Sequence, residues 1–486
     1  MIHKMIKFII AGLLVFPISS CKKFVEKGNV NINPNAASST TLKSLLPALI
    51  DATATNYYAV AYNTSMFSQQ MASYTSGPSN IDQNIDVKLD VMQGIYQNAL
   101  TNANVMIDLA TSKNSSGYAA IGKILLVSNL MMATDVYGDV PFSDAFKAPA
   151  VLYPTYDKQQ DLYPLMQKML DTAITMATAP ATGDLPGGDD FCYGGAMSKW
   201  IGAANLLKAR LFIHTTKKDV AAATTGALTA LANSISSNAN DMALIYNSRN
   251  KNPWAANISL KVITGNFFIT PSKRFVNTMN GTDYPGLIDP RLPFLMDKKN
   301  SSTYDGLANG GGNTGNTVDI TTNTFYAKET SPLLMATFAE RKFLEAEALF
   351  LANGGTATSI GSTQPAYDAY IAGITQNMTK LGVAAADMNA YLTNPLVAVG
   401  PAALTMENIM HEKQIALYLN PESWVDVRRY DYNPAVFAGM ALPLNQWSGM
   451  NGQFIRRSGL PNDELGRNPN ASASNKLTTD KVWWDQ

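Results

Sequence analysis

The stretch Ser331-Pro-Leu-Leu-Met-Ala-Thr-Phe-Ala-Glu-Arg-Lys-Phe-Leu-Glu-Ala-Glu-Ala-Leu-Phe-Leu351 shows the pattern that decides the fold. Its apolar residues recur at spacings of three and four, which places them on one face of a helix. The residues on that face are Met335, Ala339, Phe343, Ala346 and Phe350. Gly354 and Gly355 then permit a helix stop. The stretch therefore predicts an amphipathic helix over residues 331–351.

The same period recurs along most of the chain. A first helical segment is expected to begin at Thr41, and Ser198 is expected to cap another helix. The remaining predicted helices cover residues 87–110, 118–136, 159–177, 219–237, 364–381 and 405–420. About ten helices with few strand signals predict a mainly α protein. Consecutive helix pairs favour a stack of helical hairpins, although no 34-residue sequence repeat is visible.

The helical period fails between Asp241 and about Tyr326. The segment 298–324 within this region is rich in Gly, Asn, Ser and Thr, and Phe267-Phe-Ile-Thr270 resembles a short strand. A long irregular segment inside a compact protein is usually functional or disordered. We expect residues 241–330 to form an irregular region within one domain that covers residues 41–486.

The chain begins with a short apolar run, Phe8-Ile-Ile-Ala-Gly-Leu-Leu-Val-Phe16, preceded by Lys4 and Lys7. This run is too short for a permanent membrane helix and suits a secretory signal. It ends in Pro17-Ile-Ser-Ser-Cys21, which resembles the lipobox of bacterial lipoproteins. By that resemblance, residues 1–20 are removed, Cys21 carries the lipid anchor, and residues 21–40 form a tether. The alternatives are an ordinary secretory signal and a fortuitous apolar start.

Composition excludes several classes of function. Lys plus Arg and Asp plus Glu number 37 each, so no overall charge attracts nucleic acid. If Cys21 is acylated, Cys192 stands alone and no disulfide forms. His214 and His411 are the only histidines beyond the leader, which makes a zinc or iron site built on histidines unexpected. No later segment is predicted to cross a membrane.

The segment around Glu422 and Asp426 is the strongest candidate for catalytic chemistry. Two carboxylates beside Arg428 and Arg429 have the residue types of a glycosidase site. We interpret them instead as a salt-bridged structural cluster around Trp424, because such networks normally hold a fold together. His214 and His411 are expected to be core or rim residues without a metal.

Calcium remains an open possibility that we do not predict. Asp189 and Asp190 supply oxygen ligands, but no spacing in the chain matches an EF-hand loop. The sequence predicts no catalytic residue, no metal site and no cofactor.

Several stretches, in order from Cys21 to Asn470, resemble the SusD/RagB family of nutrient-binding outer-membrane lipoproteins. The stretches are Cys21-Lys-Lys-Phe24, Asn33-Pro-Asn35, Tyr137-Gly-Asp-Val-Pro-Phe142, Ser198-Lys-Trp-Ile201, Ala204-Asn-Leu-Leu-Lys-Ala-Arg210, Asp289-Pro-Arg-Leu292, Ala339-Glu-Arg-Lys-Phe-Leu-Glu-Ala-Glu347, Glu422-Ser-Trp-Val-Asp-Val-Arg-Arg-Tyr430, Arg456-Arg-Ser-Gly-Leu-Pro-Asn-Asp-Glu464 and Asn468-Pro-Asn470. Each stretch is weak alone, and the order of all of them carries the resemblance.

The resemblance implies a mainly α, tetratricopeptide-like scaffold with long irregular loops. It implies a lipid-anchored protein at the surface of the outer membrane, beside a SusC-like TonB-dependent transporter. Such a protein binds an oligosaccharide, or a peptide in some branches, delivers it to the transporter and is not an enzyme. The alternatives are a surface-anchored glycan hydrolase and a scaffold that never contacts ligand.

Ligand binding without catalysis needs aromatic rings that stack on sugars and polar groups that bond hydroxyls. Such rings are expected on loops, because rings on helices are usually in the core. The resemblance places the ligand face on the loop after the first helix and on the irregular region. The candidate ligand-binding residues are Tyr74, Asn80, Asp82, Trp254, Tyr284 and Tyr304.

Overall fold

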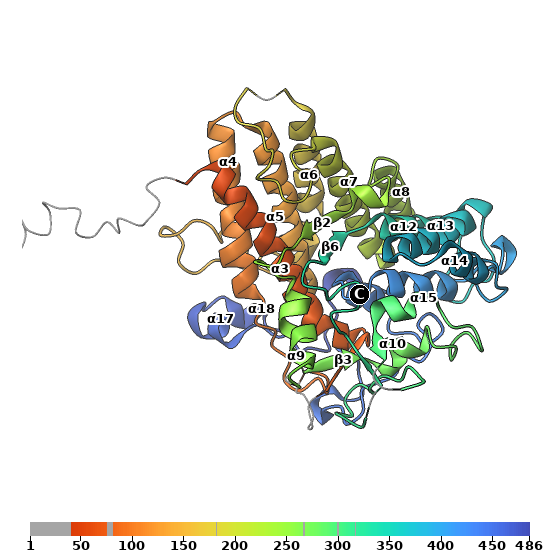
Figure 1. The fold of residues 1–486 in the computed structure, drawn as a ribbon. Helices are drawn as coiled ribbons and strands as arrows, with labels where there is room; N and C mark the ends of the chain where they lie inside the picture. The colour runs from red at the N-terminus through yellow and green to blue at the C-terminus, as the bar shows by residue number, and fades with distance from the viewer. Residues whose placement is uncertain (1–39, 75–80, 181, 266–267, 299–300, 316) are drawn as a thin grey trace, which may run out of the picture.

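A computed structural model describes residues 40–74, 81–180, 182–265, 268–298, 301–315 and 317–486. Most of this part of the chain is helical, and consecutive long helices pack as antiparallel pairs side by side (Figure 1). The long helices are α3 (Leu42–Phe67), α4 (Thr101–Ser112), α5 (Ser116–Tyr137), α6 (Gln159–Thr178), α7 (Met197–His214), α8 (Val220–Leu231), α12 (Phe338–Ala352), α13 (Gln364–Leu381) and α15 (Met406–Ala416). The predicted mainly α scaffold of helical hairpins is confirmed.

Helix α5 lies at the centre of the scaffold and contacts α3, α4, α6 and α7. By length and mean hydropathy it is the one helix of the described residues that could cross a membrane, contrary to our expectation that none would. However, 94% of its apolar window is buried inside the protein. Helices on all sides cover it, so it is apolar around its circumference because it is a core helix.

The stretch 331–351 is not one helix, which corrects our prediction. Pro332–Ala336 forms strand β6, which pairs antiparallel with β2 (Met242–Ile245). The helix α12 begins only at Phe338, where the Thr337 hydroxyl accepts a hydrogen bond from the Glu340 amide. The Glu340 carboxylate in turn accepts one from the Thr337 amide, which completes a capping box. Met335 is buried as predicted, but from a strand.

Two other helix starts differ from the prediction. Helix α7 begins at Met197, so Ser198 lies inside the helix and no side chain caps it. Residues 87–91 lie outside any helix, and the helix that follows contains a π-helical segment, η2 (Gly94–Leu100), which continues into α4. Gly94 allows η2 to approach α3, because a Cβ atom there would lie 2.7 Å from Asn56 Oδ1.

The region 241–330 contains only short elements, as predicted. They include β3 (Ile269–Pro271), α9 (Leu260–Val262), α10 (Lys273–Asn277), α11 (Leu292–Leu295), β4 (Asp297–Lys298), β5 (Val318–Asp319) and the π-helical η5 (Ala255–Ser259). β3 pairs with β1 (Met71–Ser73), which follows α3. The short elements β3 and α10 therefore lie at the lower end of the molecule in Figure 1, next to the end of α3.

The C-terminal part of the chain closes the structure. Short helices α16 (Glu422–Arg429), α17 (Asn462–Arg467) and α18 (Ala471–Ser474) are joined by irregular segments. Trp484, near the last residue, is fully buried in the same apolar cluster as Leu42 at the start of α3. One connected core therefore spans the described residues from the first helix to the last.

Candidate functional site

A hollow of about 270 Å³ lies beside α10, in the irregular region 241–330, and we call it the α10 groove. Its lining residues are Gln69, Lys273, Arg274, Asn277, Asp283, Ala308, Asn309, Gly439, Ala441, Leu442 and Leu444. They come from the end of α3, from α10, and from two irregular segments of the chain. Four segments far apart in sequence thus build one concave surface, which is the usual form of a ligand site.

Three polar side chains of the α10 groove have bonding capacity left for a ligand. Lys273 is exposed and makes only a loose ion pair, 3.7 Å long, with Asp305. The Asn277 side-chain oxygen accepts one long hydrogen bond of 3.4 Å from Asn280. The buried Oδ2 of Asp283 has no hydrogen-bond partner within the described residues. A cation, an amide and a carboxylate can together bond the hydroxyls of a sugar.

The environment of Asp283 is partly desolvated. Burial raises the pKa of its carboxyl, and His411 and Arg274 oppose that rise. Arg274 itself is buried and donates hydrogen bonds to the Ala438 carbonyl at 3.1 Å and to Gln414 Oε1 at 2.8 Å. Arg274 is therefore part of the groove wall, whereas Asp283 carries a buried carboxylate oxygen that has no hydrogen-bond partner among the described residues.

Asp82 fixes the other wall of the α10 groove. Its carboxylate accepts hydrogen bonds from the Ser73 amide at 3.0 Å, the Gly310 amide at 2.8 Å and Asn309 Nδ2 at 2.9 Å. Burial raises the pKa of Asp82, and these three hydrogen bonds oppose the rise. Gly310 has a φ of +75°, and a Cβ atom there would lie 2.0 Å from the Leu444 carbonyl oxygen. Only glycine fits at this contact.

Asp82 was predicted to contact ligand, and its burial argues against that role. Only 2% of the residue is exposed, and both carboxylate oxygens accept hydrogen bonds from the protein. Asp82 therefore positions the segment around Asn309 that lines the groove and does not itself face it.

Two other predicted residues are buried in the core. Trp254 is 2% exposed, and its ring packs edge-on against Tyr58 at a centroid distance of 4.8 Å and stacks on Tyr62. Tyr284 is 7% exposed and stacks on the His411 ring at 4.1 Å. Rings covered in this way cannot stack on a sugar, so these two assignments are corrected. Both rings lie in loop-like stretches of sequence, and their neighbours could not be predicted because they lie on distant helices: Tyr58 and Tyr62 on α3, and His411 on α15.

Tyr304 and Tyr74 are only half-buried, and their role in binding stays a prediction. Tyr304 is next to Asp305, which pairs with the groove residue Lys273, and the Lys298 ammonium lies 5.5 Å from its ring centroid. The Tyr74 amide donates to the Phe268 carbonyl at 2.7 Å, which extends the β1–β3 pairing. The predicted residues Asn80 and Cys21 lie outside the described residues.

Sequence reasoning missed the groove residues Lys273 and Asn277, and it did not select Trp447. The Trp447 ring is 41% exposed, and its amide donates to the Gln83 carbonyl at 3.0 Å. Gln83 in turn donates to the Gly310 carbonyl at 3.2 Å, which links the backbone of Trp447 to the segment that follows the lining residue Asn309. The loop-like sequence around Trp447 was a usable signal for this ring.

Asp426 lies in a buried set of ion pairs, which fits the salt-bridged cluster that we expected in this segment. Glu347 and Asp426 both bind Lys413 and Arg429, at distances between 2.6 and 3.0 Å. Burial raises the pKa of Glu347, but Arg429 and Lys413 outweigh it and hold that pKa at about 2. These carboxylates are occupied by cations inside the core and face no open cleft.

Glu422 belongs to a second buried group, with Asp135 and His214. Among the described residues, this is the one set whose ligand atoms lie close enough together for a metal ion. His214 bonds Glu422 through Nε2 at 2.9 Å and the Tyr163 hydroxyl through Nδ1 at 2.9 Å. The Asp135 carboxylate accepts from Tyr163 at 3.0 Å and from Trp484 at 2.9 Å. The group is hydrogen-bonded throughout, which is how a buried polar cluster is stabilised without an ion.

The aspartates considered for calcium are also engaged. Asp190 accepts hydrogen bonds from the amides of Cys192, Tyr193 and Gly195 and from the Trp200 indole. Asp189 accepts from the Tyr118 hydroxyl at 2.7 Å. Both carboxylates therefore stabilise the turn before α7.

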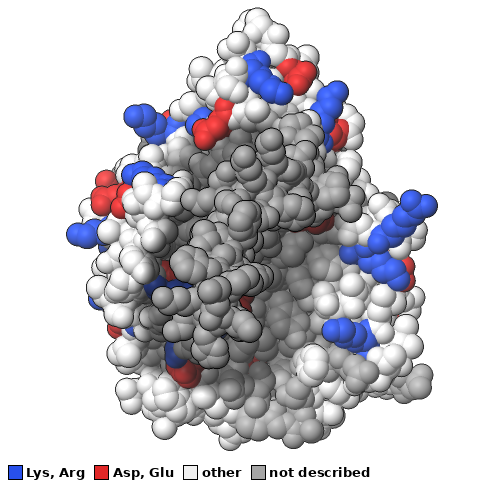
Figure 2. All heavy atoms as spheres, turned by 90° about the vertical axis from the view of Figure 1, so that its left-hand side faces the viewer, with Lys and Arg blue, Asp and Glu red and all other residues white. Residues whose placement is uncertain are grey.

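Figure 2 shows one face of the molecule, where blue and red side chains are spread among uncharged residues in the part that the structure describes.

A family described as "Starch-binding associating with outer membrane" matches residues 34–451. This chain belongs to the SusD-like family. The SusD-like chain matched no curated protein, but many solved structures share its fold. A SusD/RagB family protein from Bacteroides thetaiotaomicron has a TM-score of 0.75 at 20% identity, and the match covers 92% of this chain and 99% of that one.

Two further solved structures have a binding activity in their descriptions. A chitin-binding protein has a TM-score of 0.72 at 23% identity, over 92% of this chain and 100% of the other. A chitin-binding SusD homolog from Flavobacterium johnsoniae has a TM-score of 0.71 at 21% identity, over 92% of this SusD-like chain and 98% of the other. At these identities the likeness establishes the shared fold.

Proposed function

We propose that this SusD-like protein binds an oligosaccharide without cleaving it and delivers it to a SusC-like TonB-dependent transporter of the outer membrane. Family membership supports glycan binding at the outer membrane, and chitin binding by two proteins of the same fold supports an oligosaccharide ligand. The observation that carries the proposal is the α10 groove, where Lys273, Asn277 and Asp283 offer unspent bonding capacity. The rings proposed to stack on the sugar are Tyr304, which precedes the Lys273 partner Asp305, and Trp447, which lies three residues after the lining residue Leu444.

The non-catalytic part of the proposal rests on how the carboxylates are used. Acid–base hydrolysis needs two carboxyls that face one cleft across the scissile bond. Asp283 is the only carboxylate of the α10 groove's lining, and Glu347, Asp426 and Glu422 are occupied in the buried ion pairs described above. The groove therefore holds a sugar without an acid–base pair to attack it.

The test is calorimetric titration of residues 22–486 with maltoheptaose and with chitohexaose, followed by chromatography of the recovered sugar. We expect saturable binding of at least one glycan, intact sugar after incubation, and a loss of affinity of about tenfold in Asn277→Ala, which removes hydrogen bonds to hydroxyls. The matched control is Asn353→Ala, an exposed asparagine at the end of α12. Shortened sugar products, or equal affinity in Asn277→Ala and wild type, would refute the proposal.

The anchor and the partner are tested in cells. Labelled palmitate is expected to attach to the wild-type protein and not to Cys21→Ala, because Cys21 is the acylated residue of the proposed lipoprotein. Affinity purification of the wild type from solubilised outer membranes is expected to recover a TonB-dependent transporter. Palmitate on the Cys21→Ala protein, or purification without a transporter, would contradict the corresponding part.

A further inference from the structure

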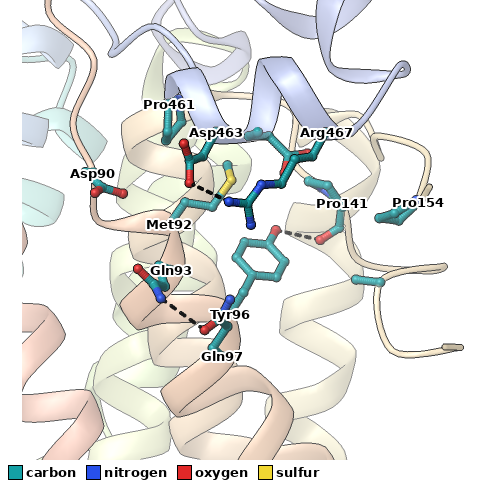
Figure 3. Close-up of a pocket in the computed structure, with 12 residues that line it drawn as sticks. Asp90, Met92, Gln93, Tyr96, Gln97, Pro141, Pro154, Pro461, Asp463 and Arg467 are labelled. Carbon is teal, nitrogen blue, oxygen red and sulfur yellow. Dashed lines mark hydrogen bonds and ion pairs between the residues drawn. The ribbon is translucent and has the colours of Figure 1, made fainter. Parts of the chain in front are cut away.

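A second hollow, which we call the Tyr96 pocket, lies between η2, the segment after α5 and the helix α17 (Figure 3). It has a volume of about 330 Å³ and shares no lining residue with the α10 groove. The lining residues are Asp90, Met92, Gln93, Tyr96, Gln97, Pro141, Ala145, Pro154, Pro461, Asp463, Glu464 and Arg467. Its size suits one or two small cyclic groups.

The walls of the Tyr96 pocket are held by bonds that do not involve a ligand. Glu464 Oε1 accepts from the Tyr156 hydroxyl at 2.8 Å and from Asn468 Nδ2 at 2.9 Å. Asn468 Nδ2 also donates to the Pro154 carbonyl at 3.0 Å, which ties α17 to the opposite segment. The Tyr96 hydroxyl donates to the Pro141 carbonyl at 2.6 Å. The pocket is therefore formed before any ligand arrives, which lowers the entropic cost of binding.

The Tyr96 ring stacks on Phe146 at a centroid distance of 6.4 Å, and the part of the ring that lines the pocket presents apolar carbon. The ring stands in the middle of the hollow in Figure 3, below the guanidinium of Arg467. Three prolines and Met92 add further apolar surface. Flat aromatic and aliphatic surface of this kind matches the C–H face of a pyranose ring.

Polar groups at the edge of the Tyr96 pocket remain available. Gln93 Nε2 donates to Gln97 Oε1 at 3.2 Å, which leaves the Gln93 oxygen and the Gln97 nitrogen unpaired within the described residues. The ion pair of Asp463 and Arg467 is 3.1 Å long and about four-fifths exposed on both sides. Such an exposed pair contributes little to stability, so Asp463 and Arg467 can separate and bond a ligand instead. Asp90 is exposed and has no side-chain partner among the described residues.

The backbone beneath these side chains is unusual. Gln93 directly precedes the π-helical segment η2, Tyr96 and Gln97 lie inside it, and the Thr101 amide at its end donates to the Tyr96 carbonyl. π-Helical turns are rare and often occur at functional sites. The spacing of three and four residues places the two amides and the ring on the same wall of the pocket.

We propose that the Tyr96 pocket is a second saccharide site, which binds one pyranose unit of an uncharged oligosaccharide separately from the α10 groove. Rings and amides are the groups that recognise a pyranose. The lining carries three carboxylates and one guanidinium, so it repels an acidic sugar. The inference rests on the proposed glycan binding but concerns residues that the α10 groove does not use.

The rim of the pocket extends this surface. Tyr153 is 55% exposed and precedes the lining residue Pro154. Its carbonyl accepts from Asn470 Nδ2 at 2.9 Å, which fixes the segment that carries the ring. A second sugar unit that leaves the pocket on this side meets the Tyr153 ring.

The test is calorimetric titration of residues 22–486 with maltoheptaose, chitohexaose and hexagalacturonate. The pocket variant is Gln93→Ala with Gln97→Ala, and the groove variant is Asn277→Ala. The matched control is Gln364→Ala, an exposed glutamine that bonds Asp368 four residues along α13 at 2.7 Å. Alanine favours a helix, so both glutamine substitutions leave the backbone intact, and melting curves check this.

We expect two binding events for a neutral glycan. The pocket variant should weaken one event about tenfold, the groove variant should weaken the other, and Gln364→Ala should change neither. A single event that only Asn277→Ala weakens overturns the second site and leaves the proposed function standing. Binding of no glycan at all overturns both. Hexagalacturonate binding that the pocket variant abolishes overturns the neutral-ligand assignment.

Discussion

Glu347→Gln is the substitution that best separates a structural charge cluster from a functional one. The Glu347 side chain is fully buried on α12 and accepts from Lys413 Nζ at 2.9 Å, Arg429 Nη2 at 2.7 Å and the Tyr430 hydroxyl at 2.8 Å. After the substitution, the buried Lys413 and Arg429 share a single carboxylate partner, Asp426. Breaking a buried ion pair in this way costs about 3–5 kcal/mol of unfolding free energy.

The pKa of Glu347 gives a second measure of the same quantity. Its folded value of about 2 lies below the ordinary value of 4.5. A carboxyl with a depressed pKa stabilises the fold above pH 4.5, and the stabilisation is lost as the pH falls toward 2. The shift corresponds to about 3 kcal/mol. We therefore expect the stability difference between Glu347→Gln and wild type to shrink below pH 4.5.

The assay is urea unfolding followed by tryptophan fluorescence at several pH values between 3 and 8. Glu345→Gln is the matched control, because Glu345 lies two residues away on the same helix and pairs with Arg341 and Lys342 at the surface. Glu345→Gln should lower the unfolding free energy by less than about 1 kcal/mol. Glycan affinity below the melting temperature should be unchanged in both variants. The reasoning fails if Glu347→Gln costs no more than Glu345→Gln, or if it abolishes binding without lowering stability.

Three further predictions concern single side chains. Trp254→Ala should lower the unfolding free energy by about 3–5 kcal/mol, because its ring is in the core, and should leave the glycan affinity of the folded protein unchanged. Trp447→Ala should weaken glycan binding and leave the unfolding free energy nearly unchanged, because its ring is exposed. Calorimetry measures the affinity of each variant, and urea unfolding measures its stability. Asp82→Ala should lower the unfolding free energy by about 3 kcal/mol, because it removes the acceptor of three buried hydrogen bonds, and should weaken binding at the α10 groove; unchanged stability would contradict this. Burial, with Asp283 and Glu412 adding, raises the pKa of Glu407 to about 7. A raised carboxyl pKa lowers stability as the pH rises from 4.5 to 7, so Glu407→Gln should raise the melting temperature at pH 8 and not at pH 4.5.

The long helices could be predicted because their signal is local. The bounds of α6 and α13 follow the apolar period closely, and α5 differs from its prediction by a few residues. A helix closes its hydrogen bonds within four residues, so a short window of sequence contains most of the information about it. The capping box of Thr337 and Glu340 is also a local signal, and it marks the true start of α12 at Phe338. The apolar residues before it led to the wrong prediction that the helix begins at residue 331.

The candidate site was only partly predictable, because long-range contacts decide which rings are free. Trp254 lies in a loop-like stretch, yet Tyr58 and Tyr62 on α3 cover it. The strand Pro332–Ala336 exists because Met242–Ile245 lies beside it, about ninety residues earlier. Nothing in the local spacing of either segment reveals such a partner.

Three features could be predicted from the residues alone: a mainly α scaffold, an irregular middle region, and the order of motifs that resembles the SusD-like family. Periodicity and motif order are visible in one sequence because they depend on residues near one another in the chain. Only the folded structure shows that Asp82 is a buried support, that Asn277 and Asp283 line one groove, and that Tyr96 lines another. Whether a side chain is buried or lines a groove depends on contacts between segments that are distant in sequence, and these contacts exist only in the folded molecule.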